Sequence, residues 1–381
     1  MKVALVHDWL TGWRGGEKVL AALCRLYPEA DLFTLVHVPG SVGHGVEERR
    51  IVTSFLQRLP FAQTRWRHYL PLFPAAVESL DLSGHGLVIS TSHAVAKGCR
   101  PAPGAVHVSY IHTPMRYVWD QFDAYFGPGR AHPFLRAAAH LVAPALRRWD
   151  VASTRRVDGL LANSRFVSER CRRFWGRAAD EVVYPPVETA RFPVAGLSAE
   201  ERSPRGYALI VSALVPYKHV DLAVRAFARA RRRLVVVGDG PELGRLRQLA
   251  ASLGEGARGV ELRGAVAQEE LVRLVQRAAF FLLPGEEDFG IAPVEAQAAG
   301  RPVLALGRGG ALETVADGRT GCFFAEPVVE ALLDALPAID RLAAGADPQE
   351  VRRHALAFDA ARFGPQLQAA IGRRLAAAAA R

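Results

Sequence analysis

Residues 285–300 read GEEDFGIAPVEAQAAG and follow the apolar run AFFLL at 279–283. The apolar run predicts a buried strand. Pro293 stands where the first turn of a helix is expected, and Gly300 stands where that helix would close. The stretch therefore predicts a strand, a turn and a short helix, which is the repeating unit of an α/β fold.

Two carboxylates, Glu287 and Glu295, flank the start of this helix with seven residues between them. Their spacing is a little over two helical turns, so both acids can face one cleft at different depths. The amides of Gly290, Ile291 and Ala292 would lie unpaired at the helix start, where they suit an anion such as a diphosphate. Carboxylates that accept hydrogen bonds from sugar hydroxyls and amides that donate to phosphates would then lie in one turn, as the binding of a sugar nucleotide requires.

This arrangement resembles the retaining family 4 (group 1) glycosyltransferases, whose signature reads Glu-x-Phe-Gly-x-x-x-x-Glu-Ala. The match runs over Glu287, Phe289, Gly290, Glu295 and Ala296 and continues into Gly-Arg-Pro-Val at 300–303. The alternative interpretation is two acids that only cap and solvate a helix start.

Length and composition are those of a two-domain globular protein. The chain has 381 residues, 50% hydrophobic and 23% charged. It contains no apolar run of about 18 residues and opens on a strand, from which we expect a cytoplasmic protein. Its four cysteines are scattered without metal spacing and are interpreted as buried thiols. The net charge of +10 is almost all arginine, since lysine occurs only at 2, 18, 97 and 218.

Strands alternate with helices along both halves of the chain, which predicts two parallel sheets covered on both faces. Strands are expected at 3–6, 32–36, 87–90, 106–110, 160–163 and 182–184, and then at 208–211, 234–237, 260–263, 279–283 and 303–306. Two prolines at 185 and 186 and the polar stretch 188–206 suit a linker, so the boundary is placed near residue 190.

The resemblance implies the GT-B architecture, in which two doubly wound Rossmann-like domains face each other across a cleft. Residues 1–190 would then form the acceptor-side domain and 191–358 the nucleotide-sugar domain. An Ala- and Arg-rich helix at 359–381 is expected to cross back onto the first domain, as it does in the family.

Lys218 follows the strand at 208–211 and precedes a helix expected at 221–230. In the family this loop supplies a lysine to the donor diphosphate, and an arginine usually stands where this chain has Ala213. The departure leaves the leaving phosphates to Lys218, to the helix amides or to an arginine from elsewhere. A solvated surface charge is the alternative, but the rarity of lysine in this chain and the strand-end position favour the site.

The first half opens with a glycine-rich turn, Trp-Arg-Gly-Gly-Glu at 13–17, in which Gly15 and Gly16 would let the backbone approach a phosphate. A second turn, Gly-Asp-Gly-Pro at 238–241, suggests a dehydrogenase fingerprint, but Pro241 and the lack of a second acidic anchor argue against it.

His112 follows the strand at 106–110, and in the family a histidine at this strand end faces the transferred sugar. A structural histidine is the alternative. Further candidates for the acceptor side are Asp8, Arg116, Asn163 and Ser164. By resemblance, Gly309, Gly310 and Glu313 belong to the loop beside the nucleotide.

Residues 58–67 mix basic and aromatic side chains, which suits either an anionic membrane surface bearing a lipid-linked acceptor or an ordinary amphipathic helix. The resemblance implies a hexosyltransferase that retains configuration and uses neither a cofactor nor a metal. The expected donor is GDP-mannose and the expected acceptor a lipid-linked saccharide of a surface polysaccharide. Alternatives are a UDP-sugar enzyme and a non-catalytic nucleotide-sugar-binding protein; nucleic acid is not an expected partner.

Overall fold

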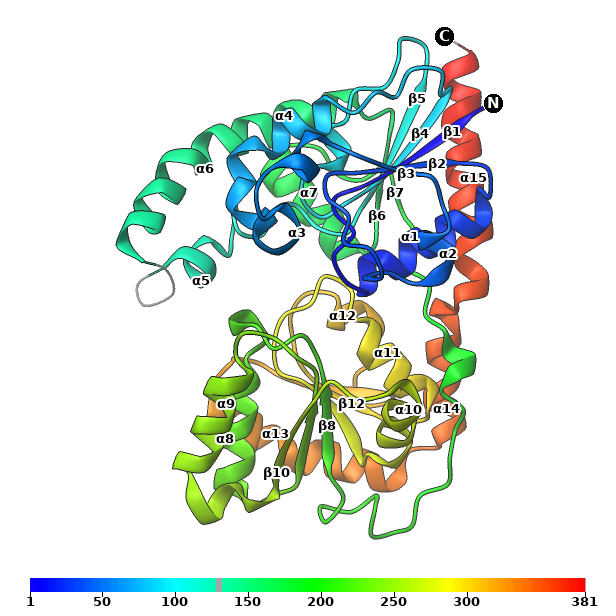
Figure 1. Cartoon of the computed structure of the whole chain (residues 1–381). Helices are drawn as coiled ribbons and strands as arrows, with labels where there is room; N and C mark the ends of the chain where they lie inside the picture. Colours follow the sequence, from blue (N-terminus) through cyan, green and yellow to red (C-terminus); the bar gives the residue numbers. More distant parts are fainter. Residues whose placement is uncertain (128–131, 381) are drawn as a thin grey trace. The chain divides into compact units, whose positions relative to one another are not determined.

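The computed structural model describes residues 1–127 and 132–380, which form two compact units (Figure 1). Unit 1 holds Met1–Pro186 together with the last segment of the chain from Ala361, and unit 2 holds Val187–Ala360. The sequence places the domain boundary near residue 190, whereas the contacts within the chain place it between Pro186 and Val187. Each unit is described by itself below.

The described residues of unit 1 form one sheet of seven parallel strands in the order β3-β2-β1-β4-β5-β6-β7. The strand order reverses between β1 and β4, which is the topological switch point of a doubly wound sheet. The strands are β1 (Val3–His7), β2 (Asp31–Thr34), β3 (Ile51–Thr53), β4 (Leu87–Ser92), β5 (Val106–Ile111), β6 (Gly159–Ala162) and β7 (Glu181–Val182).

Alternate residues of β1 enter two different core clusters, because successive side chains of a strand point to opposite faces. Leu5 packs with α1 on one face, while Ala4 and Val6 pack with α4 and α6 on the other. The helices and short helical turns of unit 1 before its last helix are α1 (Gly15–Leu26), α2 (His44–Glu47), η1 (Phe55–Arg58), α3 (Ala62–Arg65), η2 (Trp66–Leu72), α4 (Phe73–Glu78), η3 (Ala96–Gly98), α5 (Phe122–Phe126), α6 (Pro133–Ser153), η4 (Thr154–Arg156) and α7 (Arg165–Trp175).

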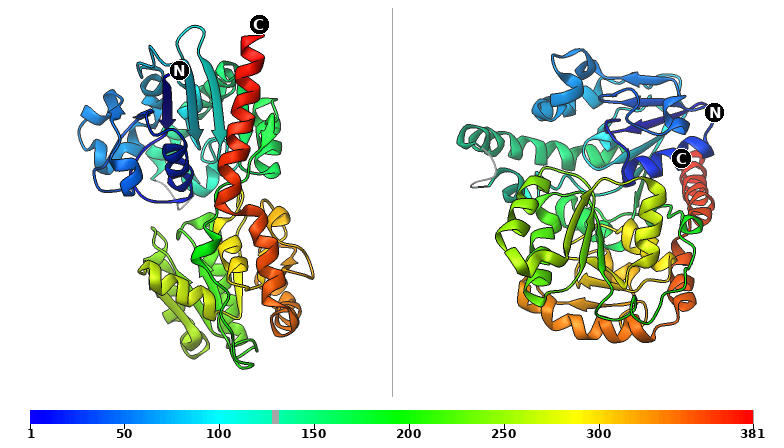
Figure 2. Two further views of the ribbon diagram at one scale, coloured as in Figure 1. Left: turned by 90° about the vertical axis from the view of Figure 1, so that its right-hand side faces the viewer. Right: turned by 60° about the horizontal axis from the view of Figure 1, so that its bottom comes forward.

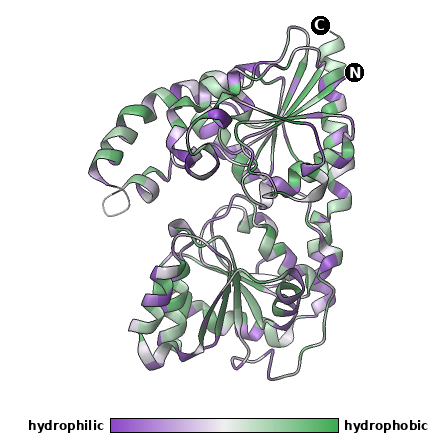
Figure 3. Ribbon diagram, in the orientation of Figure 1, coloured by the Kyte–Doolittle hydropathy of each residue, from purple (hydrophilic) through white to green (hydrophobic). Residues whose placement is uncertain are grey.

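The described residues of unit 2 form a second parallel sheet of six strands in the order β10-β9-β8-β11-β12-β13. The strands are β8 (Ala208–Val211), β9 (Leu234–Val237), β10 (Val260–Gly264), β11 (Phe280–Leu283), β12 (Val303–Leu306) and β13 (Gly321–Phe324). Figure 3 shows the strands of both units as predominantly hydrophobic, as expected for parallel sheets with two covered faces. The switch point of this sheet lies between β8 and β11.

Helices flank the strands of unit 2 and bury their apolar faces on the sheet. Val224 and Phe227 of α8, for example, are fully buried in one cluster with Leu234 of β9. The helices and helical turns are η5 (Thr189–Arg191), η6 (Pro216–Lys218), α8 (Val220–Ala230), α9 (Leu243–Ser252), η7 (Gly254–Gly259), α10 (Gln268–Arg277), α11 (Ile291–Ala298), α12 (Ala311–Thr314), α13 (Val329–Gly345), α14 (Pro348–Ala355) and η8 (Leu356–Phe358).

The last helix, α15 (Ala360–Ala379), packs on the sheet of unit 1 (Figure 2). Phe363, Leu367 and Ile371 lie in one core cluster with Leu5 and Leu20 of the first strand and helix. The Phe363 ring meets the Tyr110 ring edge-on, with 5.8 Å between their centroids. The final helix is therefore part of the core of unit 1.

Three local features differ from the sequence predictions. The short strands β3 and β13 are absent from the predicted set. Residues 58–67 do not form one amphipathic helix but break into η1, α3 and η2, because Pro60 precedes Phe61, which has a left-handed backbone (φ 55°). Among the described residues, no helix is both long and apolar enough to cross a bilayer.

Candidate functional site

The loops that leave the switch point of unit 2 carry the residues predicted to bind the donor. Lys218 ends the η6 turn after β8, and Glu287 lies in the loop after β11. In doubly wound sheets, ligands bind outside the carboxyl ends of the strands at this point. The fold thus brings the predicted lysine and the first predicted carboxylate to the place where such a unit binds ligands.

Lys218 and Glu287 form an ion pair. The Lys218 side chain is only 10% exposed and the Glu287 side chain 23%, so the pair lies below the surface but within reach of solvent. The Lys218 ammonium also lies 5.1 Å from the centroid of the Tyr217 ring. An ammonium has three donors and Glu287 takes one, so the remaining N–H groups of Lys218 can donate to a ligand.

Three glycines allow the loops of this site to touch. A Cβ on Gly285 would approach the Lys218 Cα to 2.8 Å, and a Cβ on Gly309 would approach the Glu287 carbonyl oxygen to 2.5 Å. The Gly310 amide donates to that same carbonyl at 2.8 Å. Backbone therefore packs directly on backbone at these positions, and the loops after β8, β11 and β12 hold one another in place.

The N-terminus of α11 lies directly after this loop, as the sequence predicts. Gly290 is its N-cap with φ 89°, a left-handed conformation that favours glycine. The amides of Ile291 and Ala292 belong to the first turn, where no intrahelical carbonyl is available to them. Pro293 sits in the same turn, where its missing N–H costs nothing.

Glu295 and Phe289 have different surroundings from Glu287. Glu295 lies in the second turn of α11 and is 8% exposed. Phe289 is 3% exposed, and its ring meets the Phe358 ring edge-on with 5.5 Å between centroids. The Phe289 ring therefore packs the loop onto the unit, and its predicted part in donor binding stays a prediction.

Ala213 lies in the loop after β8, which packs against the turn at 238–241. A Cβ on Gly238 would come within 1.8 Å of the Ser212 carbonyl oxygen, and one on Gly240 within 2.4 Å of the Leu214 carbonyl oxygen. Those two glycines thus serve loop packing, which explains the turn that resembles part of a dinucleotide fingerprint.

Among the ion pairs of the described residues, Glu287 has one cationic partner, Lys218.

The switch point of unit 1 also gathers predicted residues. Gly15 and Gly16 open α1 after β1, and His112 follows β5. A Cβ on Gly16 would lie 3.7 Å from His112 Nε2 and 3.6 Å from the His7 ring, which is ordinary van der Waals contact. The turn that was predicted to approach a phosphate therefore borders His112 directly.

His112 belongs to a cluster of three imidazoles. The His93 ring centroid lies 6.2 Å from that of His112 and 6.0 Å from that of His7. Burial, with a smaller contribution from the neighbouring histidines, lowers the pKa of His112 to about 3. Its Nε2 is buried and finds no hydrogen-bond partner within the described part of the chain. A neutral imidazole with an unused nitrogen is suited to hydrogen-bond a hydroxyl.

Sequence reasoning missed Glu17 and His93, which complete this cluster. Glu17 accepts a hydrogen bond from the Arg14 amide at 2.9 Å and lies 3.7 Å from His7 Nε2. Burial alone would raise the pKa of Glu17, but the nearby imidazoles of His7 and His93 and the backbone outweigh it and place that pKa below its usual value. The position of His93 directly after β4, at the same sheet edge as the turn after β1, was the available signal.

Asp8 fixes a loop rather than facing solvent. Its fully buried carboxylate accepts hydrogen bonds from four consecutive amides, those of residues 93–96, at 2.7–3.0 Å. His93 Nδ1 lies 3.0 Å from the same carboxylate. The predicted acceptor-side role of Asp8 is therefore replaced by a scaffolding one, because its oxygens are occupied by the backbone.

Asn163 and Ser164 likewise shape the backbone. The Asn163 side-chain amide donates to the His112 carbonyl oxygen at 3.1 Å, and Ser164 caps α7 by accepting from the Val167 amide at 3.0 Å. Asn163 thus tethers His112 to the end of β6. Arg116 is 8% exposed in the loop after β5, and its carbonyl accepts from the Gln121 amide at 2.9 Å.

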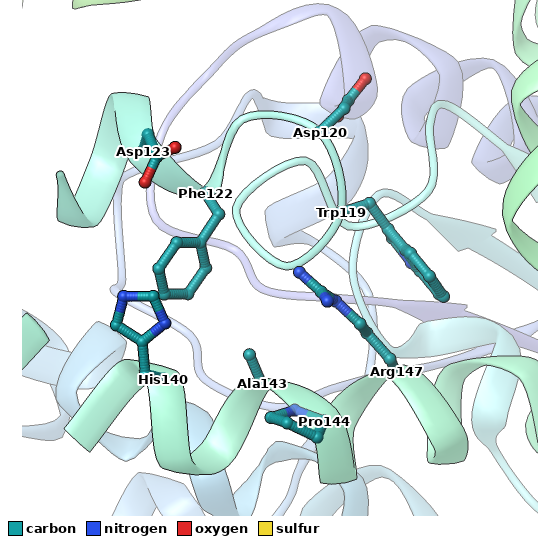
Figure 4. A pocket seen from close by; sticks show the side chains of 8 residues that line it. All are labelled: Trp119, Asp120, Phe122, Asp123, His140, Ala143, Pro144 and Arg147. Atoms are coloured by element: carbon teal, nitrogen blue, oxygen red, sulfur yellow. The ribbon is translucent and has the colours of Figure 1, made fainter. Parts of the chain in front are cut away.

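A separate cavity of about 370 Å³ lies in unit 1 between the loop after β5 and α6 (Figure 4). The Phe122 and His140 rings lie against each other at one side of it, with 4.6 Å between centroids. The Arg147 guanidinium points into the cavity while its Nε donates to the Val118 carbonyl oxygen at 2.7 Å. The lining residues are Trp119, Asp120, Phe122, Asp123, His140, Ala143, Pro144 and Arg147.

In the described part of the chain, no group of three or more His, Cys, Asp or Glu side chains could hold a metal ion.

Comparison with known proteins gives a family match within unit 2. A sequence model of the family described as glycosyl transferases group 1 matches residues 198–341, all within unit 2. The matched stretch contains Lys218, Glu287 and the whole of α11. Unit 2 thus carries the domain that this family model describes.

Curated relatives are similar over less than half of this chain. The GDP-mannose-dependent alpha-(1-6)-phosphatidylinositol monomannoside mannosyltransferase of Mycolicibacterium smegmatis is 37% identical over 193 residues, which cover 45% of this chain and 50% of the relative. A D-inositol 3-phosphate glycosyltransferase of Streptomyces avermitilis is 35% identical over 187 residues, or 43% of this chain and 40% of the relative. The chain therefore spans about half the length of the curated relatives it matches.

Solved structures resemble the whole chain. Sucrose-phosphate synthase of Thermosynechococcus elongatus aligns with a TM-score of 0.73 and 18% identity over 99% of this chain and 100% of that one. WaaG, a glycosyltransferase involved in lipopolysaccharide biosynthesis, aligns with a TM-score of 0.68 and 17% identity over 96% of this chain and 98% of that one. An Anabaena protein in complex with UDP aligns with a TM-score of 0.67 and 16% identity over 98% of this chain and 100% of that one. The fold is therefore that of the GT-B glycosyltransferases, with two Rossmann-like α/β domains.

Proposed function

We propose that the protein is a retaining glycosyltransferase that moves a hexose from a nucleoside diphosphate to a hydroxyl. The observation that carries the proposal is the Lys218–Glu287 pair at the switch point of unit 2, directly before the N-terminus of α11. A cation, a carboxylate and helix amides are together the groups that a sugar diphosphate requires. Unit 2 then binds the donor and unit 1 the acceptor.

The protein assists the reaction mainly by electrostatics. Lys218 and the first-turn amides of α11 meet the charge that develops on the departing diphosphate, without a metal ion or a cofactor. Glu287 accepts hydrogen bonds from the sugar hydroxyls, and Glu295 from the ribose. The leaving diphosphate itself takes the acceptor proton on the face from which it departs, which retains the configuration.

In unit 1, His112 is the proposed sugar-facing residue. Its ring is neutral over the working pH range because burial depresses its pKa to about 3, and its Nε2 is unoccupied by the described residues. Gly16 places no side chain against this nitrogen, where a Cβ would come within 3.7 Å. A sugar hydroxyl could therefore approach both the imidazole and the amides of the turn at 15–16.

We further propose that the donor is GDP-mannose and the acceptor a lipid-linked oligosaccharide of a surface polysaccharide. The name of the Mycolicibacterium smegmatis relative, which specifies GDP-mannose and a phosphatidylinositol mannoside, supports both choices. The reaction would take place in the cytoplasm, on the inner face of the plasma membrane. Exposed aromatic residues between basic ones support membrane contact: Phe61 is 69% exposed, and the Arg65 guanidinium lies 5.3 Å from its ring centroid.

A UDP-sugar donor is the second candidate. The Anabaena structure of similar fold was solved in complex with UDP. A non-catalytic nucleotide-sugar-binding protein would use the same site without turnover.

The test is a thermal-shift and transfer panel of GDP-mannose against UDP-glucose and other UDP-sugars. Ligand stabilisation grows with the ratio of ligand concentration to dissociation constant, so the preferred donor gives the largest shift. We expect the largest shift with GDP-mannose and transfer that Glu287→Ala removes. A shift with UDP-glucose alone would reverse the donor assignment. Binding without any transfer or donor hydrolysis would leave only the sensor interpretation.

A further inference from the structure

The loop after β5 and the short helix α5 concentrate aromatic side chains. Half of the ten residues at 117–126 are aromatic, compared with 8% of the whole chain. Trp119 and Phe122 line the cavity of about 370 Å³ that this segment forms with α6 (Figure 4). Aromatic walls and a few polar groups around a cavity of this size are the composition of a small-molecule site.

The walls of this cavity are held in place by contacts within unit 1. The Trp119 ring stacks on the Phe174 ring with 5.0 Å between centroids, and its indole donates to Asp150 at 2.8 Å. The Arg170 guanidinium donates to both carboxylate oxygens of Asp120. The cavity is therefore preformed, so a ligand would enter it at little cost in reorganisation.

Two charged side chains of the lining have hydrogen-bonding capacity left. A guanidinium has five N–H donors, and Arg147, which is partly buried, uses its Nε–H on the Val118 carbonyl oxygen; the other four have no hydrogen-bond partner in the described part of the chain. The Asp123 carboxylate of α5 likewise has no ion pair or hydrogen bond within that part. Because Arg170 already balances Asp120, one guanidinium and one carboxylate of opposite charge remain.

These two groups select the chemical class of the ligand. A simple anion would meet the Asp123 carboxylate, a simple cation would meet the Arg147 guanidinium, and an apolar molecule would desolvate both charges without a partner. An uncharged polyhydroxyl molecule suits both, because a hydroxyl can donate to a carboxylate and accept from a guanidinium. The apolar face of a sugar ring can also pack on the aromatic walls.

We propose that this cavity binds an uncharged saccharide unit of the acceptor, as a subsite separate from the hydroxyl that receives the transferred sugar. The loop that forms it starts directly after β5 with His112, the proposed sugar-facing residue, which is not part of the lining. The inference rests on the proposed glycosyltransferase function for calling the ligand an acceptor. Saccharide binding itself is measured without turnover.

The experiment is calorimetric titration of the full chain, in the absence of any nucleotide sugar. The probes are two neutral trisaccharides, of mannose and of glucose, a trisaccharide of galacturonic acid, and phenylalanine as an aromatic zwitterion. We expect a neutral trisaccharide to bind best. Asp123→Ala and Arg147→Met should each weaken that binding about tenfold or more, because each removes hydrogen bonds to a charged group.

The matched control is Arg148→Met, which removes an exposed guanidinium from the same helix outside the lining and should leave saccharide binding unchanged. Asp123 is exposed, so Asp123→Ala keeps the test valid if Arg147→Met disturbs α6. Equal affinity of wild type and Asp123→Ala would overturn the proposal. So would a preference for the galacturonic acid trisaccharide or phenylalanine, or binding of neither neutral trisaccharide.

Transfer assays distinguish this subsite from the place of the chemistry. Asp123→Ala should raise the KM for the mannose trisaccharide as acceptor about tenfold and leave kcat unchanged, because the contact is the same in the ground and transition states. The KM for the nucleotide sugar should stay the same. Saccharide binding that Asp123→Ala weakens, in a protein without transferase activity, would contradict the proposed function but support saccharide binding in this cavity.

Discussion

The two buried lysines of this chain show how differently one side chain can be used. Lys97 in unit 1 is completely buried. Its ammonium forms an ion pair with Asp150 Oδ1 at 2.8 Å and donates to the Asp150 carbonyl at 2.6 Å and to Ser153 Oγ at 2.5 Å. Lys218 in unit 2 is 8% exposed and pairs with Glu287 alone among the charged groups of the described residues.

The number of occupied donors separates the two roles. The Lys97 ammonium is held within the protein by two hydrogen bonds and an ion pair, and its partner Asp150 also accepts from the indoles of Trp119 and Trp175 at 2.8 and 2.7 Å. Such a network stabilises the position of α6 and has no capacity left for a ligand. Lys218 keeps N–H donors available beside the carboxyl ends of the central strands of unit 2. A lysine that binds a ligand differs from a structural lysine in this respect.

The largest effect is expected from Lys97→Met. It leaves the Asp150 carboxylate buried without its cation, and breaking a buried pair in this way costs about 3–5 kcal/mol of unfolding free energy. All six tryptophans lie in unit 1, so urea unfolding followed by tryptophan fluorescence reports this unit alone. The midpoint should move to clearly lower urea.

A compensating change gives the control for this prediction. Asp150→Asn added to Lys97→Met removes the uncompensated charge while an amide oxygen can still accept from an indole. Part of the lost stability should return. If Lys97→Met alone unfolded at the same urea concentration as the wild type, Lys97 would contribute no more to stability than Lys218 does.

The second effect is expected on catalysis. Lys218→Ala removes the ammonium that stabilises the leaving diphosphate and should lower kcat by about 10²–10³-fold, as loss of one transition-state donor does elsewhere. The partner left behind, Glu287, can reach water, so unfolding should change little. Lys218→Arg, which keeps the charge, should retain more of the activity. Transfer at the wild-type rate by Lys218→Ala would place this lysine outside the site.

The smallest effect extends the comparison from the lysines to the histidines of unit 1. Burial lowers the pKa of His107 to about 4 and that of His112 to about 3, from an ordinary value of 6.5. Between the ordinary pKa of 6.5 and the lowered pKa of each group, the unfolded chain binds a proton that the folded unit does not. The free energy of unfolding therefore falls as pH falls from about 6.5 toward 3. The full contribution of these groups is present above about pH 6.5.

Thermal unfolding followed by tryptophan fluorescence checks this dependence. From about pH 8 to about pH 5 the midpoint of unit 1 should fall, and His112→Gln should make the fall shallower because one depressed group is gone. This window lies above the carboxylate range, so the lowered pKa of Glu17 does not contribute to it. A slope unchanged by His112→Gln would contradict the buried, neutral state of this ring.

Much of the fold follows from the sequence because most strands are short apolar runs with polar flanks. The predicted 208–211, 234–237 and 303–306 coincide with β8, β9 and β12. The two missed strands lie at sheet edges: β3 has three residues, none fully buried, and β13 begins with Gly321. Edge strands bury little surface, so their periodicity carries little signal.

The site was predictable where a residue type implies its chemistry and was not where the backbone decides. Lys218 and Glu287 were predicted from the family resemblance together with their positions after expected strands, and the structure brings the two side chains together. Asp8 was misjudged because a sequence does not show that four amides in the loop at 93–96 will converge on one carboxylate. The backbone contacts of Gly285 and Gly309 were not foreseen for the same reason, since close approach of backbones is a property of the folded chain.

The position of α15 has a consequence for the order in which the chain can fold on the ribosome. Phe363, Leu367 and Ile371 belong to the core of unit 1, yet they are synthesised after every residue of unit 2. Unit 2 can therefore close as soon as it emerges, whereas the unit that begins first must wait, with part of its apolar sheet uncovered, until translation delivers its last helix.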